Sequence, residues 1–363
     1  MFESVAQHIA ATGEHRVTLV GSGRQEAGRA YNFIHVPAVS RDRFERWPKM
    51  PFARHEFMYE EATFATRLAL LPEVATADVT MTCSFPYVNW ALRRPRSGGR
   101  PPHVFVTQNG DWGPQRNGLE PRFFDCEGLI CTNPVYFERQ KQVFFSRLIP
   151  NGIDPARFMP GPSQKQRFGW RSDLPVVLMV SALEPGKRVI EAIRAMADVP
   201  HAQLVVAGDG PLRDEVSRLA EQLLPGRFTR GTYRHDEMPA LYRSADVFLH
   251  TKILESFGNV YIEALACGIP VVAHDDPVTR WILGDFGRRV DTNNRPELSA
   301  AIRNALQHDD VSEDAADWAR TRYAWPVVAQ QYADFLSEVA HRSRQKSGSG
   351  PLREAPMLSD RSS

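Results

Sequence analysis

Two glutamates on either side of a small turn are the residues of this chain whose types and spacing best suit chemistry. The run from Glu255 to Val272 reads ESFGNVYIEALACGIPVV, so seven residues separate Glu255 from Glu263. A turn that opens a helix leaves unpaired N–H groups at the positive end of the helix dipole, which is a phosphate-binding arrangement. An acid beside the phosphate can hold sugar hydroxyls, and an acid on the helix can hold a ribose. The alternative is an ordinary strand, turn and helix with two surface acids.

Composition sets modest bounds on the class of protein. The 363 residues are 42% hydrophobic and 24% charged, and a net charge of +1 gives no general reason to expect nucleic-acid binding. No apolar run approaches the roughly 18 residues of a membrane helix, and Met1-Phe2-Glu3 does not begin a signal peptide. The spacing of the four cysteines fits no zinc site, so free thiols in a reducing cytoplasm are expected.

These residues must be positioned by alternating strands and helices. In the first half, strands are expected at 15–21, 33–37, 78–82, 103–107 and 129–131, with helices at 54–71 and about 134–145. In the second half, strands are expected at 175–181, 202–207, 227–231, 246–250 and 269–273, with helices at 187–197 and 211–223. This alternation predicts the α/β class with parallel sheets.

Proline and glycine mark a boundary near Ile149–Asp154 and again at 160–162. We therefore predict two Rossmann-like, doubly wound domains facing a cleft, over residues 1–150 and 151–324. A helix over 325–342 and a disordered tail over 343–363 would follow. Ligands of such sheets bind at the carboxyl ends of the strands, so the cleft between the domains is the expected site.

Several segments, in order, resemble the family-4 group of retaining glycosyltransferases with the GT-B architecture. The run Glu255–Glu263 matches the E-x7-E signature of that group. The other matching segments are Ile149–Asp154 with Arg157 and Phe158, Leu183–Arg188, Val205–Leu212, Phe228–Thr232 and Met238–Phe248. The resemblance covers about residues 149–335 well and the first half weakly.

The resemblance implies an enzyme that moves a sugar from a nucleoside diphosphate donor, such as a UDP- or GDP-sugar, with retention of configuration. Glu255 would contact the donor sugar, Glu263 the ribose, and Lys187 the leaving phosphate. The further donor-binding residues that it implies are Ser256, Phe257, Gly258, Asn259, Arg188, Gly208, Gly210, Gln108 and Asn109. No cofactor or metal is expected, in keeping with the absence of an Asp-x-Asp pair.

Three features depart from the family. An arginine five residues before the lysine is replaced by Ala182, for which Arg188 is a candidate substitute. The histidine after strand 103–107 is replaced by Gln108, which cannot act as an acid or base near neutral pH. Third, Phe2–Thr12 has the spacing of the family's first helix, so the strand and glycine-rich loop before it are missing. We interpret this as a misassigned start codon or a shortened chain rather than a true deletion.

Two basic segments bear on an acceptor. Residues 41–54 alternate cations with Phe44, Trp47 and Phe52, which would suit an anionic membrane surface or a lipid-linked acceptor. A solvated loop with aromatic anchors in the core is the favoured alternative. Residues 93–102 are expected to be a basic connector.

The leading hypothesis is a cytoplasmic glycosyltransferase of polysaccharide, glycolipid or glycosylated-metabolite biosynthesis, with peripheral contact to the cytoplasmic face of a membrane as one further expectation. Its partners would be the donor and a sugar, lipid-linked or small-molecule acceptor, and not a nucleic acid. The alternatives are a non-catalytic binder of nucleotide-sugars, a sugar-nucleotide epimerase, or a phosphorylase. The sequence leaves the sugar, the base and the acceptor open.

Overall fold

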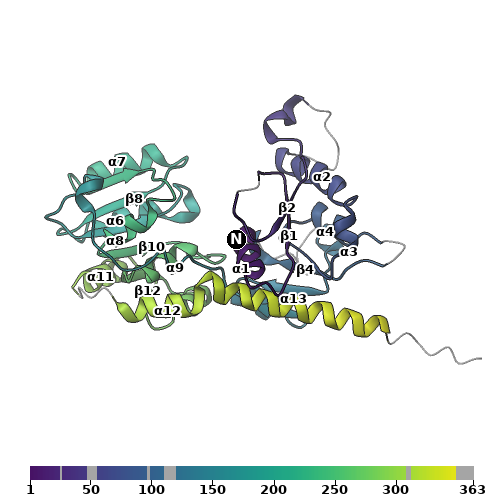
Figure 1. The fold of residues 1–363 in the computed structure, drawn as a ribbon. Helices are drawn as coiled ribbons and strands as arrows, with labels where there is room; N and C mark the ends of the chain where they lie inside the picture. The colour runs from purple at the N-terminus through teal and green to yellow at the C-terminus, as the bar shows by residue number, and fades with distance from the viewer. Residues whose placement is uncertain (25–26, 47–54, 96–98, 110–119, 308–311, 349–363) are drawn as a thin grey trace, which may run out of the picture.

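The computed structural model describes residues 1–24, 27–46, 55–95, 99–109, 120–307 and 312–348. Two α/β units lie side by side, and a long C-terminal helix runs from the second unit along the first (Figure 1). All strand pairs within them are parallel. The predicted α/β class with parallel sheets is confirmed.

The second domain is built on one continuous six-stranded sheet. Its order is β12-β11-β10-β7-β8-β9. The strands are β7 (Val176–Val180), β8 (Gln203–Ala207), β9 (Phe228–Gly231), β10 (Val247–His250), β11 (Val271–His274) and β12 (Gly287–Val290). The four central strands, β7, β8, β10 and β11, are short and mostly apolar and are buried on both faces, as strands of a covered parallel sheet are, whereas the edge strands β9 and β12 are only partly buried.

Alternate residues of β7 pack into two separate hydrophobic cores, one on each face of the sheet. Val177 and Met179 pack with α6 (Val189–Met196), α7 (Arg213–Leu223) and α11 (Arg295–Leu306). Val176 and Leu178 pack on the opposite face. The helices there are α8 (Met238–Arg243), α9 (Asn259–Ala266), α10 (Pro277–Leu283) and α12 (Glu313–Tyr323). Successive side chains of a strand point to opposite faces, so one strand holds both layers in place.

The first domain has two separate sheets. β1 (Thr18–Gly21) pairs only with β2 (Asn32–His35), and a second sheet has the order β3-β4-β5-β6. The strands of that sheet are β3 (Thr80–Thr82), β4 (His103–Val106), β5 (Gly128–Cys131) and β6 (Ser146–Leu148). Within the described ranges no strand joins β1 to β3.

Five helices surround these sheets: α1 (Phe2–Ala11), α2 (Glu56–Leu68), α3 (Pro72–Thr76), α4 (Tyr87–Leu92) and α5 (Pro134–Gln140). Val20 of β1 packs with Leu68 of α2 and Val88 of α4. The helix that the sequence predicted over Phe2–Thr12 is confirmed, since α1 spans Phe2–Ala11.

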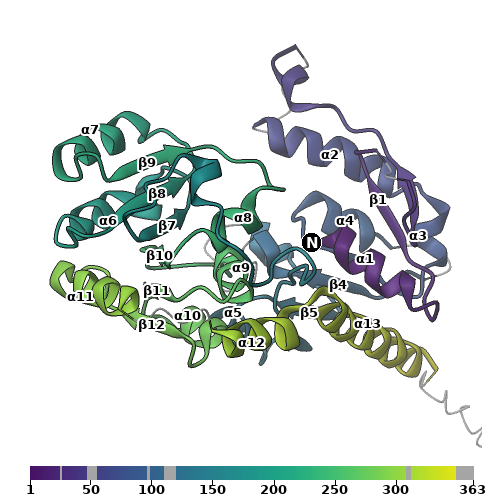
Figure 2. The same cartoon turned by 60° about the vertical axis from the view of Figure 1, so that its left-hand side comes forward.

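The C-terminal helix α13 (Trp325–Gly348) ties the two domains together. It begins where α12 ends, and it lies against α1 beneath the first domain (Figure 2). Tyr332 and Phe335 of this helix are fully buried against Val104 and Ile130, which lie in the four-stranded sheet of the first domain. Residues 343–348 were predicted to begin a disordered tail, but they continue this helix. Residues 349–363 lie outside the described ranges.

The basic segments are tied to the fold where they are described. Phe44 is buried against Tyr59, which matches the aromatic-anchor alternative, while Arg41 lies over the Phe57 ring. The rest of that segment, 47–54, lies outside the described residues. Arg100 pairs with Glu127 at 2.6 Å, which holds one end of the predicted connector. Among the helices that the structure describes, none is both long and apolar enough to cross a membrane.

Candidate active site between the domains

The loop that follows β10 carries the first glutamate of the predicted pair. Gly258 ends this loop in the left-handed region, with φ of 82°, and is the N-cap residue of α9. A Cβ at this position would lie 2.6 Å from ring atoms of Tyr261 and 3.0 Å from Cγ of Glu255. Glycine is therefore needed here for both its backbone conformation and its lack of a side chain. It places Glu255 beside the free N–H groups that open α9.

Glu255 is held on both carboxylate oxygens. Oε1 accepts hydrogen bonds from the Ser256 backbone N–H at 3.0 Å and from Lys252 Nζ at 3.0 Å. Oε2 lies 3.5 Å from Lys187 Nζ. The side chain is only 9% exposed, and burial alone would raise its pKa. The hydrogen bond from Lys252 and the charge of Lys187 outweigh burial, so the pKa of Glu255 is lowered and the carboxylate is ionised.

His250, at the end of β10, faces the same carboxylate from the side. Its Nε2 is 3.8 Å from Oε2 of Glu255, and its Nδ1 is 3.0 Å from the Tyr261 hydroxyl. Burial, opposed by the Glu255 charge, lowers the pKa of His250 to about 4. The imidazole is therefore neutral near pH 7.

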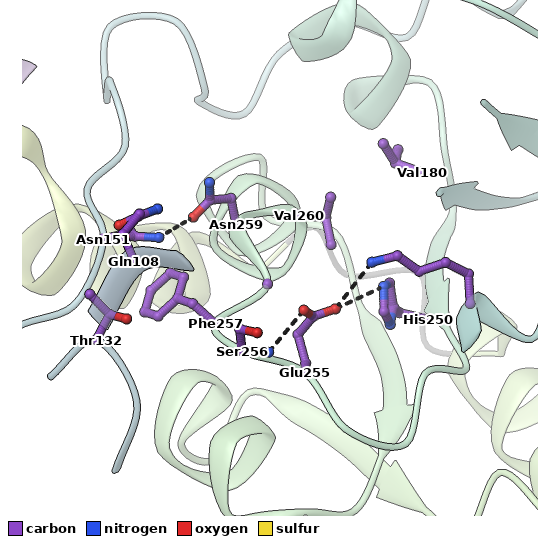
Figure 3. Close-up of a pocket in the computed structure, with 12 residues that line it drawn as sticks. Gln108, Thr132, Asn151, Val180, His250, Glu255, Ser256, Phe257, Asn259 and Val260 are labelled. Carbon is purple, nitrogen blue, oxygen red and sulfur yellow. Dashed lines mark hydrogen bonds and ion pairs between the residues drawn. The ribbon is translucent and has the colours of Figure 1, made fainter. Parts of the chain in front are cut away.

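These groups line a cavity of about 260 Å³ to which both domains contribute (Figure 3). From the second domain come Val180, Lys187, His250, Glu255, Ser256, Phe257, Gly258, Asn259 and Val260. From the first domain and the junction come Gln108, Thr132 and Asn151. Among the described residues that line this cavity, the charged side chains are all on the second-domain side.

Asparagines from the first domain and the junction hold the glutamate loop. Asn133 caps α5 with its Oδ1, while its Nδ2 donates to the carbonyl oxygens of Ser256 at 2.7 Å and Glu255 at 3.3 Å. Asn151 Nδ2 donates to Asn259 Oδ1 at 2.9 Å (Figure 3). The Oε1 of Gln108 and the Oδ1 of Asn151 are buried without a hydrogen-bond partner. Two acceptor atoms at the cavity are therefore available to a ligand with donor groups.

Comparison with known proteins follows the same division of the chain. Residues 162–325 match the family model described as glycosyl transferases group 1. A GDP-mannose-dependent alpha-(1-6)-phosphatidylinositol monomannoside mannosyltransferase of Mycolicibacterium smegmatis is 33% identical over 214 residues, which cover 52% of this chain and 55% of that protein. The chain thus spans about half the length of such relatives.

Solved glycosyltransferase structures share the fold of the whole chain. Sucrose-phosphate synthase from Thermosynechococcus elongatus superposes with a TM-score of 0.70 at 20% identity, covering 95% of this chain and 92% of its own. Anabaena Alr3699/HepE in complex with UDP and glucose superposes with a TM-score of 0.69 at 18% identity, covering 93% and 96%. The predicted GT-B architecture is confirmed.

The second glutamate of the predicted pair does not line the cavity. Glu263 lies about one helical turn into α9, where Tyr242 of α8 donates a hydrogen bond to its Oε2 at 2.7 Å. Burial raises the pKa of Glu263, and the charges of His235 and Arg157 act in the opposite direction. A ribose contact by Glu263 stays a prediction.

Three other predicted donor residues have structural roles in this domain. Arg188 extends toward the Thr292 carbonyl oxygen at 3.5 Å and Glu191 at 3.7 Å and does not line the cavity, so its replacement of the cation missing at Ala182 stays a prediction. Added Cβ atoms at Gly208 and Gly210 would lie 1.9 and 2.7 Å from carbonyl oxygens of the neighbouring β7 loop. These glycines allow two loops to pack closely. The side chain of Asn109 lies outside the described ones.

The residues at or beside the site that were not predicted from the sequence include Thr132, Asn133, Asn151, His250 and Lys252. Asn151 lies in the junction motif, and His250 and Lys252 come just before the glutamate run, so their places in the sequence were a usable signal. Thr132 and Asn133 follow a short strand of the first domain with no motif to mark them. Only the contact between domains brings them to Glu255.

Proposed function

We propose that this chain transfers a sugar from a nucleoside diphosphate donor to an acceptor, with retention of configuration at the sugar. The observation that carries the proposal is the ionised Glu255 beside the N-terminus of α9, with Lys187 within 3.5 Å, in a cavity shared by two GT-B domains. The match of residues 162–325 to the family model described as glycosyl transferases group 1 supports it.

In the proposed reaction the bond between the sugar and the diphosphate breaks through an oxocarbenium-like state. Negative charge then grows on the departing phosphate, and fixed donors aimed at it lower the barrier. Lys187 supplies a point charge, and the backbone N–H groups that open α9 supply hydrogen bonds. Glu255 accepts hydrogen bonds from hydroxyls of the donor sugar. The departing phosphate takes the acceptor proton on the same face, which gives retention.

For the acceptor we propose a lipid-linked molecule, handled at the cytoplasmic face of a membrane. Support comes from the relative named as acting on a phosphatidylinositol monomannoside. A sugar or small-molecule acceptor is the competing possibility. The donor base is open between guanine and uracil, because one relative is named for GDP-mannose and one solved neighbour binds UDP.

The first experiment is a thermal-shift screen with UDP, GDP and ADP. A nucleotide at 100 times its dissociation constant stabilises the folded state by about 2.7 kcal/mol, which is readily detected. The matching sugar nucleotides are then incubated with candidate acceptors, and nucleoside diphosphate release is measured. Binding without release would favour the non-catalytic binder that Ala182 and Gln108 suggest. Conversion of the sugar without release would favour an epimerase.

A further inference from the structure

His250 is a buried histidine that lines the cavity and has no part in the steps proposed above. Only 2% of its side chain is exposed, and it lies between Tyr261 and Glu255 (Figure 3 shows it beside Glu255). Tyr261 is itself fully buried in the first turn of α9. A buried polar group of this kind is retained only when its hydrogen bonds are satisfied or used.

The contacts on both sides select one tautomer of His250. Burial raises the pKa of the Tyr261 hydroxyl well above its ordinary value, so the group keeps its proton and can donate to Nδ1 at 3.0 Å. The ring proton is then on Nε2. The opposite tautomer would turn a lone pair on Nε2 toward the carboxylate of Glu255, 3.8 Å away, which is repulsive.

The space between Nε2 and Glu255 suits one kind of ligand atom. At 3.8 Å the two groups are too far apart for a direct hydrogen bond, yet a single oxygen can lie within bonding distance of both. That oxygen must accept from the Nε2–H group and donate to the carboxylate. A hydroxyl does both, whereas an ionised phosphate oxygen would be repelled by Glu255.

We propose that His250 contacts the donor sugar, donating its Nε2–H to a hydroxyl that Glu255 also binds, and that Tyr261 fixes the tautomer that makes this possible. His250 is thus a substrate-binding residue and Tyr261 is a positioning residue. The inference rests on the proposed function, since it assigns a contact within the same site.

The test compares two substitutions at His250. Gln places an amide donor near the position of Nε2, whereas Asn places its amide near Nδ1 and leaves no donor toward the cavity. His250→Asn should weaken binding of UDP-glucose or GDP-mannose, whichever the parent binds, by about tenfold, the loss of one hydrogen bond. His250→Gln should recover most of it. Neither should change affinity for free UDP or GDP by more than about twofold.

Tyr261→Phe tests the tautomer. It should weaken sugar-nucleotide binding in the same selective way, while Tyr323→Phe, which removes a buried hydroxyl bonded to the Ile282 carbonyl at 2.9 Å, should not. Nitrogen-15 NMR of the histidine side chains, with the His250 signals assigned by their loss in His250→Gln, should show the proton on Nε2 in the parent. Its population should fall in Tyr261→Phe.

The possible results of these experiments distinguish a failure of the His250 assignment from a failure of the proposed function. A parent that binds the sugar nucleotide, with variants that bind it equally well, overturns the inference alone. So does a proton on Nδ1 in the parent, or an equal loss for UDP-glucose and UDP. A parent that binds none of UDP, GDP and ADP overturns the proposed function, and this inference with it.

Discussion

The two faces of the cavity differ in charge. The second-domain face carries Glu255 and Lys187, with the free N–H groups of α9, whereas the first-domain and junction face carries Gln108, Thr132 and Asn151, which are all neutral. In the proposed reaction the donor brings a diphosphate, which a cation and free N–H groups can bind. We therefore expect the donor to bind mainly to the second domain, and the neutral face to hold the glutamate loop in place.

The two domains also differ in the continuity of their sheets. The six strands of the second domain form one sheet with helices on both faces, while the first domain has separate sheets of two and four strands. A continuous sheet places several strand ends along one edge, and β7 and β10 of the second domain are neighbours there. The loops that follow these two strands carry Lys187 and Glu255 to the same point.

The sharpest test of the charged face is Glu255→Gln. The proposed role predicts a fall in transfer of roughly 10²- to 10³-fold, as for loss of a group aimed at the reacting centre. Binding of the free nucleoside diphosphate should survive, because the substitution keeps the size of the side chain and the α9 N-terminus. Steady-state transfer kinetics and calorimetry measure the two. Transfer within about threefold of the parent, less than 1 kcal/mol of barrier, would contradict the assignment.

The buried histidine of the charged face predicts a pH dependence of stability. The pKa of His250 falls from 6.5 to about 4 on folding, so between these values the unfolded chain holds a proton that the folded chain refuses. Acidification through this window therefore favours unfolding. At pH 4.5 the loss relative to pH 7 should be about 2 to 3 kcal/mol from this residue.

Urea unfolding of the parent and His250→Gln at both pH values checks this. The variant has no histidine at this position, so it should not lose the roughly 2 to 3 kcal/mol that His250 costs the parent on acidification. The difference in unfolding free energy between the two proteins should therefore narrow as the pH falls. A gap that stays constant or widens would show that folding does not lower the pKa of His250.

Lys187→Ala should weaken binding of UDP or GDP by about 10- to 100-fold, since a charged hydrogen bond to phosphate is lost. Binding of the uncharged nucleoside should change little. Lys141→Ala is the matched control in the first domain, where that lysine pairs with Glu138 on the surface. Equal losses for nucleoside and diphosphate would refute the phosphate role.

Gly258→Ala tests the geometry of the loop rather than its charge. The substitution meets both a positive φ and the Tyr261 ring at 2.6 Å, and it should cost about 2 kcal/mol of stability and most of the transfer activity. Gly169→Ala has a φ of 68° with open space around the new Cβ, so it isolates the backbone term, about 1 kcal/mol. Thermal unfolding measures the stability of both variants. Equal losses of stability in Gly258→Ala and Gly169→Ala would contradict this account.

The smallest effect is expected on the neutral face. Asn133→Ser keeps an N-cap for α5 but removes the donor to the Ser256 and Glu255 carbonyl oxygens. Transfer should fall about fivefold, near 1 kcal/mol, with little loss of stability. Asn294→Ser is the control, because Asn294 caps α11 away from the cavity. An unchanged transfer rate would mean that the first domain does not hold the loop.

Much of the second domain could be predicted from its sequence. An apolar run such as Val176–Val180 has the length and composition of a central strand, and an amphipathic helical pattern follows it in the sequence. The placement of Glu255 next to a helix start is also local, because Gly258 and α9 follow it directly in the chain. The strands β6 and β12 were missed, since a three- or four-residue strand with half-buried polar side chains has no clear pattern.

The sequence by itself thus determined the α/β class, the glutamate loop and the glycine that shapes it, because these depend on neighbours within a few residues. The tertiary structure decided the direction of Arg188, the separation of Glu263 from the cavity and the role of Gly208 in loop packing. It also brought His250 against Glu255, and Asn133 across 123 residues to the Ser256 carbonyl. Such contacts depend on how strands and domains meet, which no short stretch of sequence encodes.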